Sequence, residues 1–417
     1  MSAVSAAVPA SSRGMRGSRR TVILALALGA FGIGTTEFVA MGLLPSIADS
    51  LGTSEPTAGH VISAYALGVV VGAPLIAALT ARMSRRTLLI ALMIAFTVGN
   101  AATVFAQSYG MLMFARFIAG LPHGAYFGVA SLVAAHLAGP SSRAKAVGQV
   151  MLGLSVANVV GVPAATWLGS TLGWRAAFVV VAVIGLLTIA ALCWYLPSLT
   201  GMKITNPMTE LGALVRPQVW FTLFIGIVGF GGMFAFYTYI NTTLTTVSGV
   251  AESLIPFALM LFGLGMVAGN IVGGALADRG VVRAIAIGLV AIMAMLLLFV
   301  LVASNPWAAL ALTFLIGLSG TALTPALQIR LMDVADDAQT LAAALNHSAL
   351  NIANAGGAWL GGLVIAAGYG YRAPSLLGAG LAVAGLMVLG LAMLFARHTR
   401  KKAVAPMPEP LVTVDAH

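Results

Sequence analysis

Charged side chains are scarce in this sequence. Asp, Glu, Lys and Arg together make up 8% of its 417 residues, whereas hydrophobic residues make up 60%. Soluble domains carry roughly 25% charged residues, so this chain lacks the polar groups that would cover a water-facing surface of that size. Its 48 glycines fit helices that pack closely in membranes through small residues. The composition therefore predicts an integral membrane protein surrounded by lipid.

Several features of enzymes and nucleic-acid-binding proteins are also missing. The single cysteine, Cys193, excludes an intrachain disulfide and has no metal-ligand partner at a suitable spacing. The apolar segments contain no paired carboxylates, no histidine-rich metal spacing and no nucleophile constellation, and the chain has no Gly-x-x-x-x-Gly-Lys phosphate loop. No basic and aromatic soluble module accompanies the net charge of +10. We therefore expect no enzyme activity, no metal or other cofactor, no use of ATP and no nucleic-acid binding.

The chain consists largely of apolar stretches, each near the length of one membrane crossing. A helix needs about 20 apolar residues to cross the hydrocarbon core. The first stretch is too long for a signal peptide and lacks a small-residue cleavage site, so we interpret it as a span. The predicted fold is an all-α integral membrane protein with twelve transmembrane helices. They are placed at residues 22–44, 58–79, 87–106, 110–137, 146–169, 175–196, 218–243, 254–277, 283–303, 307–331, 341–366 and 372–396.

The distribution of Lys and Arg predicts the orientation. Of the 21 basic residues, 18 lie in the two tails or at the even-numbered junctions between spans. Only Arg175 and Arg372 lie at the opposite junctions, and Arg116 lies inside a span. Cytoplasmic segments carry the excess of Lys and Arg, so both termini are predicted to be cytoplasmic, in a membrane of the bacterial inner-membrane type. The basic excess also attracts anionic lipid headgroups.

The chain repeats itself at an offset of 197 residues. Glu55 matches Glu252 at this offset, and Arg82 and Arg86 match Arg279 and Arg283. Chance coincidence is the alternative for the glycines in a chain with so many of them, but the charged pairs fall at equivalent junctions. We therefore predict an internal duplication. Seven glycines also match: Gly29, Gly32, Gly34, Gly52, Gly68, Gly72 and Gly120 correspond to Gly226, Gly229, Gly231, Gly249, Gly265, Gly269 and Gly317.

The duplication divides the chain into two six-helix bundles, residues 21–197 and 218–396. A basic N-terminal tail (1–20), a linker (198–217) and a C-terminal tail (397–417) are predicted to be cytoplasmic. Because six is an even number, both copies enter the membrane in the same direction, as parallel pseudo-repeats.

Glu37 is the only acidic residue inside any of the predicted spans. A charged side chain at the centre of the bilayer costs at least about 2.5–3.5 kcal/mol on insertion scales, which makes Glu37 a functional candidate. By helical rise, Glu37 lies about 10 Å below the outer end of the first span and Arg116 about 9 Å below the outer start of the fourth. The two opposite charges are therefore predicted to lie at similar depth.

Several sequence blocks together resemble the major facilitator superfamily over nearly the whole length. They are residues 34–38 (Gly-Thr-Thr-Glu-Phe), 72–75 (Gly-Ala-Pro-Leu), 82–86 (Arg-Met-Ser-Arg-Arg), 116–124 (Arg-Phe-Ile-Ala-Gly-Leu-Pro-His-Gly), 161–163 (Gly-Val-Pro) and 173–176 (Gly-Trp-Arg-Ala). Within that superfamily the chain resembles the twelve-span drug:proton antiporters, and most of all the branch that exports sugars, purines or chloramphenicol. The resemblance implies the major facilitator fold and alternating access. It does not indicate the substrate.

In that fold, spans 1, 4, 7 and 10 line a central cavity, so Glu37 and Arg116 would face each other. We expect Glu37, Arg116 and His123 to couple proton binding to substrate occupancy. A permanent structural ion pair or a neutral, hydrogen-bonded glutamic acid is the alternative for the first two, and a simple hydrogen bond to a neighbour is the alternative for His123.

The same resemblance assigns residues to gating and to a hinge. The loop motif between spans 2 and 3 is represented by Arg82, Arg85 and Arg86, although Ala81 and Ser84 replace its Asp and second Gly. Asp278 and Arg279 keep the fuller form in the second half, where Asp278 would supply a latch; a solvated loop is the alternative. In span 5, Asn158, Gly161 and Pro163 are expected to form a hinge, against the alternative of an ordinary packing kink.

The two copies differ at the positions that carry charge. At the 197 offset, Glu37 becomes Phe234, Arg116 becomes Thr313 and His123 becomes Gly320. We therefore expect a proton-handling first half to face an aromatic, hydrogen-bonding second half across the substrate. Packing aromatics and polar helix-to-helix contacts are the alternatives. The expected substrate-cavity residues are Thr36, Phe230, Phe234, Tyr237, Asn241, Asn346, His347 and Asn351.

The predicted function is secondary active transport: efflux of a small amphipathic molecule, such as a drug, in exchange for protons, by a monomer. The proton gradient is the expected energy source. A proton-coupled importer and an exporter of sugars or purines are the alternatives, and a substrate sensor that does not transport is a more remote one.

Overall fold

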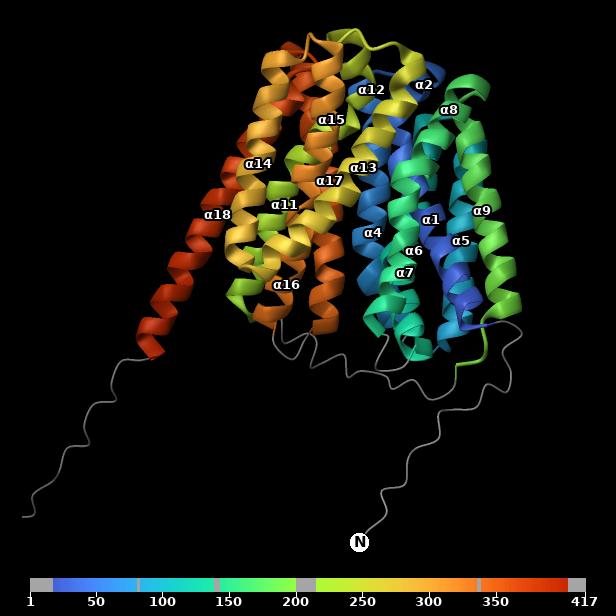
Figure 1. Cartoon of the computed structure of the whole chain (residues 1–417). Coiled ribbons are helices and arrows are strands. Elements are labelled where there is room, and N and C mark those ends of the chain that lie inside the picture. Colours follow the sequence, from blue (N-terminus) through green and yellow to red (C-terminus); the bar gives the residue numbers. More distant parts are fainter. Residues whose placement is uncertain (1–17, 81–82, 139–142, 200–214, 336–338, 404–417) are drawn as a thin grey trace, which may run out of the picture.

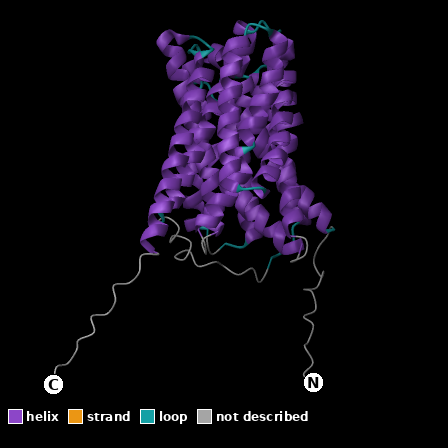
Figure 2. Ribbon diagram, turned by 60° about the vertical axis from the view of Figure 1, so that its left-hand side comes forward, coloured by secondary structure: helices purple, strands orange, loops and turns teal. Residues whose placement is uncertain are grey.

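A computed structural model describes residues 18–80, 83–138, 143–199, 215–335 and 339–403. Within these ranges the chain forms long, roughly parallel helices and no β-strand (Figures 1 and 2). The first and last described residues lie at the same end of the bundle, which we call the terminal end, and the opposite end we call the far end (Figure 1). Eleven helical segments of the described chain are long and apolar enough to cross a membrane.

Residues 18–199 form the N-terminal half, and most of its helices are long and run between the terminal end and the far end (Figure 1). Short helices α2 and α3 lie at the far end (Figure 1). The elements are α1 (Arg19–Gly42), α2 (Leu44–Leu51), α3 (Glu55–Ala58), α4 (His60–Leu79), α5 (Arg85–Phe105), α6 (Tyr109–Ala138), α7 (Arg143–Val156), the π-helical turn η2 (Ala157–Gly161), α8 (Val162–Leu172) and α9 (Trp174–Tyr195).

Residues 215–403, the C-terminal half, follow a similar order. The elements are α11 (Pro217–Thr238), α12 (Ile240–Thr242), the π-helical turn η4 (Thr243–Val247), the 3₁₀ turn η5 (Glu252–Leu254), α13 (Ile255–Asp278), α14 (Val281–Val302), α15 (Pro306–Thr321), α16 (Leu323–Ala335), α17 (Gln339–Val364), the π-helical turn η6 (Ile365–Tyr369) and α18 (Ala373–Ala403).

Local sequence signals explain where many of these helices begin. Ser18 and Ser84 accept hydrogen bonds from the backbone amides of Thr21 and Thr87 at the starts of α1 and α5. Asn305 accepts from two amides at the start of α15. These side chains satisfy backbone donors that the first helical turn leaves without partners.

The predicted all-helical membrane fold is confirmed, and eleven of the predicted stretches coincide with the apolar helices, with boundaries shifted by a few residues. The remaining stretch, 58–79, contains the 20-residue helix α4, which is not among those eleven. The count of twelve spans and the domain boundaries therefore stay predictions. Most of the predicted linker and tails lies outside the described residues.

Glycines hold the helices close together in the same way in both halves. A Cβ atom on Gly68 or Gly120 would clash with a backbone carbonyl oxygen, because α4 and α6 touch each other there. In the C-terminal half, Gly265 and Gly317 place α13 and α15 in the same contact, against Phe314 and Phe262. These positions are related by the 197-residue offset. A side chain at any of them would push two helices apart.

Candidate functional site

Arg116 of α6 is buried in the interior of the N-terminal half, with 1% of its surface exposed. Its guanidinium donates to the side-chain hydroxyl of Thr36 and to the Thr36 carbonyl oxygen, both at 2.9 Å. The Thr36 hydroxyl in turn donates to Asn100 Oδ1 at 2.5 Å. The charge is therefore held by neutral oxygen atoms of α1, which α5 supports through Asn100.

Two aromatic rings complete the surroundings of Arg116. Its guanidinium carbon lies 4.4 Å from the ring centre of Tyr65 and 5.1 Å from that of Phe178. A cation over the face of an aromatic ring is stabilised by about 0.5–2 kcal/mol, more when both groups are shielded from water. The guanidinium therefore has stabilising contacts that do not require a carboxylate.

Glu37 lies next to Thr36 on α1 and is 7% exposed. Within the described part of the chain, no side chain forms a hydrogen bond or ion pair with its carboxyl group. Arg116 is nevertheless close enough to interact with it electrostatically, and so are Tyr65 and Tyr237. The expected direct contact between Glu37 and Arg116 is thus not formed here, because Arg116 is bonded to the preceding residue.

Tyr65 of α4 connects Arg116 to the predicted proton-coupling histidine. Its hydroxyl lies 3.0 Å from Nδ1 of His123, which is 3% exposed. The His123 ring lies 5.2 Å from Phe127, centre to centre, and Phe127 stacks on His347 of α17 at 6.0 Å. A continuous row of side chains therefore runs from Arg116 in the N-terminal half to His347 in the C-terminal half.

Sequence reasoning missed Tyr65, although a signal for it existed. At the 197 offset Tyr65 becomes Phe262, so only the N-terminal half has a hydroxyl at this position. Phe262 stacks on Tyr237 instead, with ring centres 3.9 Å apart. This is the same kind of difference that singled out Glu37, Arg116 and His123.

The expected aromatic residues of α11 gather beside Glu37 as a packed cluster. Phe234 stacks on Phe38 of α1 at 6.3 Å and lies 5.7 Å from Phe230. Tyr237 meets Phe38 edge-on at 5.9 Å. All four rings are at least 96% buried, so in this conformation they seal the space between α1 and α11.

The expected polar residues of the C-terminal half lie in two places. On α17, Asn346 donates to Gln328 Oε1 at 2.7 Å, and Asn351 donates to the carbonyl oxygen of His347 at 3.0 Å. Among the described residues, the side-chain oxygen of Asn351 has no hydrogen-bond partner, and neither amide atom of buried Asn354 has one. Asn241 lies elsewhere, because it donates to the carbonyl oxygen of Gly42 at 2.6 Å near the far end.

Hydrogen bonds at the far end join the two halves, and some of them involve a second carboxyl group, that of Glu55. Glu55 of α3 accepts a hydrogen bond from the hydroxyl of Thr242 at 2.5 Å and another from Tyr371. Ser63 of α4 donates to the carbonyl oxygen of Ala355 at 3.0 Å. Together with Asn241, these bonds close the far end between the halves. Sequence reasoning did not assign Glu55 a role, although its match to Glu252 was visible.

Burial of Glu55 raises the pKa of its carboxyl group above the usual value, and the neighbouring charge of Asp49 raises it further. The hydrogen bonds from Thr242 and Tyr371 act in the opposite direction but are outweighed. Glu55 lies outside the apolar helical segments, in the short helix between α2 and α4. Tyr239 is the other titratable group that interacts with it there.

The predicted gating residues lie at the terminal end. Arg86 donates to the carbonyl oxygen of Cys193 at 2.8 Å, which joins α5 to α9. Arg85 is half-buried, and Asp278 and Arg279 are exposed at the end of α13. Asp278 forms no ion pair with any described residue. Arg82 lies outside the described residues, and the gating role of the whole set stays a prediction.

The predicted hinge coincides with an irregular helical turn. Ala157–Gly161 is π-helical, and Pro163 is the second residue of α8, just beyond it. The backbone of Asn158 lies against Gly263 of α13, where a side-chain carbon would clash. Asn158 is 5% exposed and its side-chain oxygen has no hydrogen-bond partner among the described groups. The irregular turn therefore sits at a contact between the two halves.

Comparisons with known proteins agree with this arrangement. The family model described as the Major Facilitator Superfamily matches residues 26–279 and 222–415. The chain belongs to the major facilitator superfamily. It is 43% identical to "Inner membrane transport protein YdhP" of Escherichia coli over 367 residues, which cover 88% of this chain and 94% of that protein.

The chain is also similar to a resistance protein in sequence and to a solved transporter structure in fold. It is 34% identical to the "Chloramphenicol resistance protein" of Streptomyces lividans over 355 residues, covering 84% of this chain and 90% of that one. The fold matches the crystal structure of a bacterial homologue of the human lysosomal transporter Spinster, with a TM-score of 0.70, 17% identity and coverage of 92% and 97%. This member of the superfamily is accordingly a membrane transporter and not an enzyme.

Proposed function

We propose that this transporter exports a small amphipathic molecule in exchange for protons, through twelve spans arranged as two parallel six-helix repeats. The observation that carries the proposal is Glu37, a buried carboxyl group that has no hydrogen-bond partner among the described residues and lies beside Arg116. Such a group can gain or lose a proton without breaking a bond to the protein. The glycine contacts repeated at the 197 offset support the two-repeat architecture.

The far end is proposed to face outward and the terminal end the cytoplasm. The excess of Lys and Arg at the terminal end supports this orientation. In that orientation the bonds of Glu55, Asn241 and Ser63 close the outer side between the two halves. Outward opening requires these bonds between the halves to separate.

Arg116 and Glu37 would perform the exchange without covalent chemistry. Uptake of a proton by Glu37 removes a negative charge from beside Arg116, and its release restores that charge. Because Arg116 is already held by Thr36, it stays in place in both states. A substrate that contacts the aromatic cluster of Phe38, Phe234 and Tyr237 would touch the groups that surround Glu37, so that occupancy and protonation influence each other.

The similarity to a chloramphenicol resistance protein supports export and suggests the first substrates to test. The purified protein is reconstituted into liposomes, and accumulation of labelled chloramphenicol, purines and sugars is followed with and without an imposed pH gradient. The proposal expects one of these compounds to move against its own gradient only when protons flow the other way. Movement of substrate and protons in the same direction would show import by symport. Flux indifferent to the pH gradient would overturn proton coupling.

A further inference from the structure

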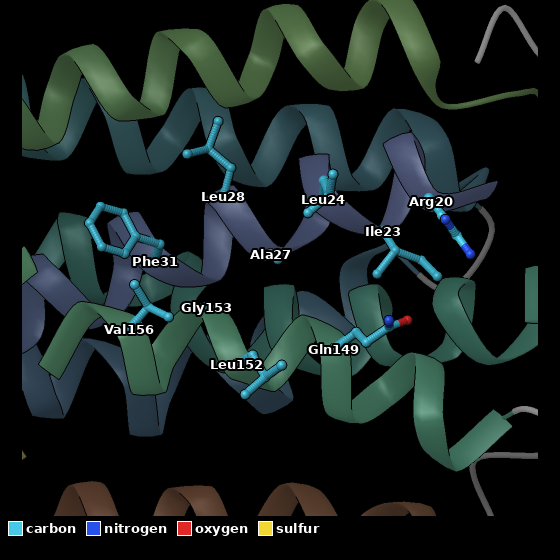
Figure 3. Close-up of a pocket in the computed structure, with 10 residues that line it drawn as sticks. All are labelled: Arg20, Ile23, Leu24, Ala27, Leu28, Phe31, Gln149, Leu152, Gly153 and Val156. Carbon is cyan, nitrogen blue, oxygen red and sulfur yellow. The ribbon is translucent and has the colours of Figure 1, made fainter. Parts of the chain in front are cut away.

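A groove runs along the surface between α1 and α7, from the terminal end toward mid-depth (Figure 3). Its volume is about 470 Å³, within the usual range of small-molecule sites. The floor and walls are apolar over most of the length, and they comprise Leu24, Ala27, Leu28 and Phe31 of α1 and Leu152 and Val156 of α7.

The groove faces away from the protein interior. Leu28 lies nine residues from Glu37, which places the two on opposite sides of α1 at 3.6 residues per turn. On α7, Val156 lies two residues from Asn158 and therefore points away from the side that touches α13. Leu24 and Leu152 accordingly have 68% and 57% of their surface exposed. In a membrane these side chains contact lipid.

The length of the groove matches one half of a bilayer. Arg20 and Phe31 mark its two ends on α1, and eleven residues of helix rise about 16 Å. The hydrocarbon core is about 30 Å thick, so the groove spans about the depth of one leaflet. An acyl chain that starts at the terminal end would fit along it.

Among the described residues that line the groove, the polar side chains lie at its terminal end. Arg20 and Gln149 face each other across the mouth (Figure 3). Arg20 is exposed, and its guanidinium has no partner among the described residues. The neighbouring Arg19 is different, because it donates to the carbonyl oxygen of Ala138 at 3.3 Å. The positive charge of Arg20 is therefore available to a ligand at the point where the apolar groove meets the headgroup region.

We propose that this groove is a binding site for one anionic phospholipid. An acyl chain lies along Leu24, Leu28 and Leu152, the phosphate pairs with Arg20, and the Gln149 amide donates a further hydrogen bond. Basic groups beside such clefts on the cytoplasmic side recognise anionic headgroups, and each contributes about 1 kcal/mol. That energy corresponds to about fivefold in affinity. The site is independent of the proposed substrate and of proton coupling.

The test uses the full-length protein purified in a neutral detergent, with native mass spectrometry to count bound lipids as phosphatidylglycerol or phosphatidylcholine is added. The proposal expects one tight phosphatidylglycerol site in the wild type. Arg20→Gln lowers affinity at that site about fivefold and leaves phosphatidylcholine binding unchanged. Arg397→Gln is the matched control, because Arg397 is an exposed arginine at the terminal end of α18, far from the groove.

A second variant tests the apolar part. Ala27→Phe fills the floor of the groove and should weaken binding of phosphatidylglycerol with long acyl chains, while short-chain phosphatidylglycerol is less affected. Equal loss in Arg20→Gln and Arg397→Gln would overturn the proposal, because it would mean a diffuse attraction to basic residues. Equal binding of the two lipids by the wild type would also overturn it. Should Ala27→Phe fail to fold, the two arginine variants still decide the outcome.

Discussion

The two halves have the same close helix packing at their centres, but among the described residues only the N-terminal half has charged side chains there. Gly68 and Gly120 bring α4 against α6 just as Gly265 and Gly317 bring α13 against α15. Inside that scaffold the N-terminal half carries Glu37, Arg116 and Tyr65, and the C-terminal half has Phe234, Thr313 and Phe262 at the matching positions. Buried charge was therefore retained or gained in one copy only. Close helix packing depends on the glycines and does not require charged side chains, because it is the same in the half that lacks them at the matching positions.

The largest expected effect comes from removing the carboxyl group of Glu37, the one acidic residue within the predicted spans. Glu37→Gln keeps the size and polarity of the side chain but cannot release a proton. Gradient-driven accumulation in proteoliposomes should fall to the level of protein-free liposomes. Glu252→Gln, at an exposed carboxylate, is the control and should transport normally. Full gradient-driven transport by Glu37→Gln would mean that the asymmetry between the halves has no role in coupling.

The scaffold itself should be equally sensitive in both halves. Gly120→Ala and Gly317→Ala each force a Cβ atom against a carbonyl oxygen of the neighbouring helix. Overpacking of this kind costs about 1–3 kcal/mol. The measurement is the thermal midpoint of the detergent-solubilised protein. Gly128→Ala is the control, because a Cβ atom there has nothing within 4 Å, and it should be neutral or slightly stabilising. A loss in only one half would contradict the shared scaffold.

Tyr65 offers a smaller effect that is specific to the N-terminal half. Tyr65→Phe removes the hydroxyl that lies 3.0 Å from His123. A double-mutant cycle with His123→Ala should give a coupling energy of about 0.5–1.5 kcal/mol in unfolding experiments. The matching positions, Phe262 and Gly320, have no polar side-chain atoms and cannot form such a bond, so this coupling is specific to the N-terminal half. Coupling near zero at Tyr65 would show that the bond contributes nothing to stability.

The pH dependence of the far end should be the smallest effect. Burial raises the pKa of Glu55 when the far end is closed, whereas in an open far end Glu55 would be hydrated and its pKa nearer the ordinary value of about 4.3. The closed state therefore binds the proton more tightly. By linkage, the closed fraction should rise as pH falls toward and through the raised pKa and decline as pH increases above it.

Spin labels can measure that fraction. Labels at Thr53→Cys and Ser253→Cys, one in each half, are placed on a Cys193→Ser background, and their distance distribution is recorded between pH 8 and pH 5. In the Glu55→Gln variant the far end should stay closed throughout this range, and the Glu252→Gln variant should behave like the wild type. A closed fraction that falls with decreasing pH would reverse the assigned sign.

The sequence was sufficient to predict the membrane helices, because lipid requires every crossing segment to be long and apolar. It also placed Glu37 and Arg116 at one depth, since depth follows from helical rise alone. It could not show that Arg116 bonds Thr36 instead of Glu37, because that choice depends on side-chain directions within two packed helices. Asn241 was expected at the cavity and lies near the far end. Its partner, Gly42, belongs to the other half, and the docking of the halves is not encoded in either segment alone.

Two of the hydrogen bonds that close the far end have backbone oxygen atoms as acceptors. Ser63 donates to the carbonyl of Ala355, and Asn241 donates to that of Gly42. Any residue type supplies the same acceptor, so the accepting positions can change during evolution without a compensating change in the donor. Pairs of positions that vary together reveal contacts between side chains. These bonds should leave no such record, and an alignment of relatives would therefore underestimate how the two halves are joined.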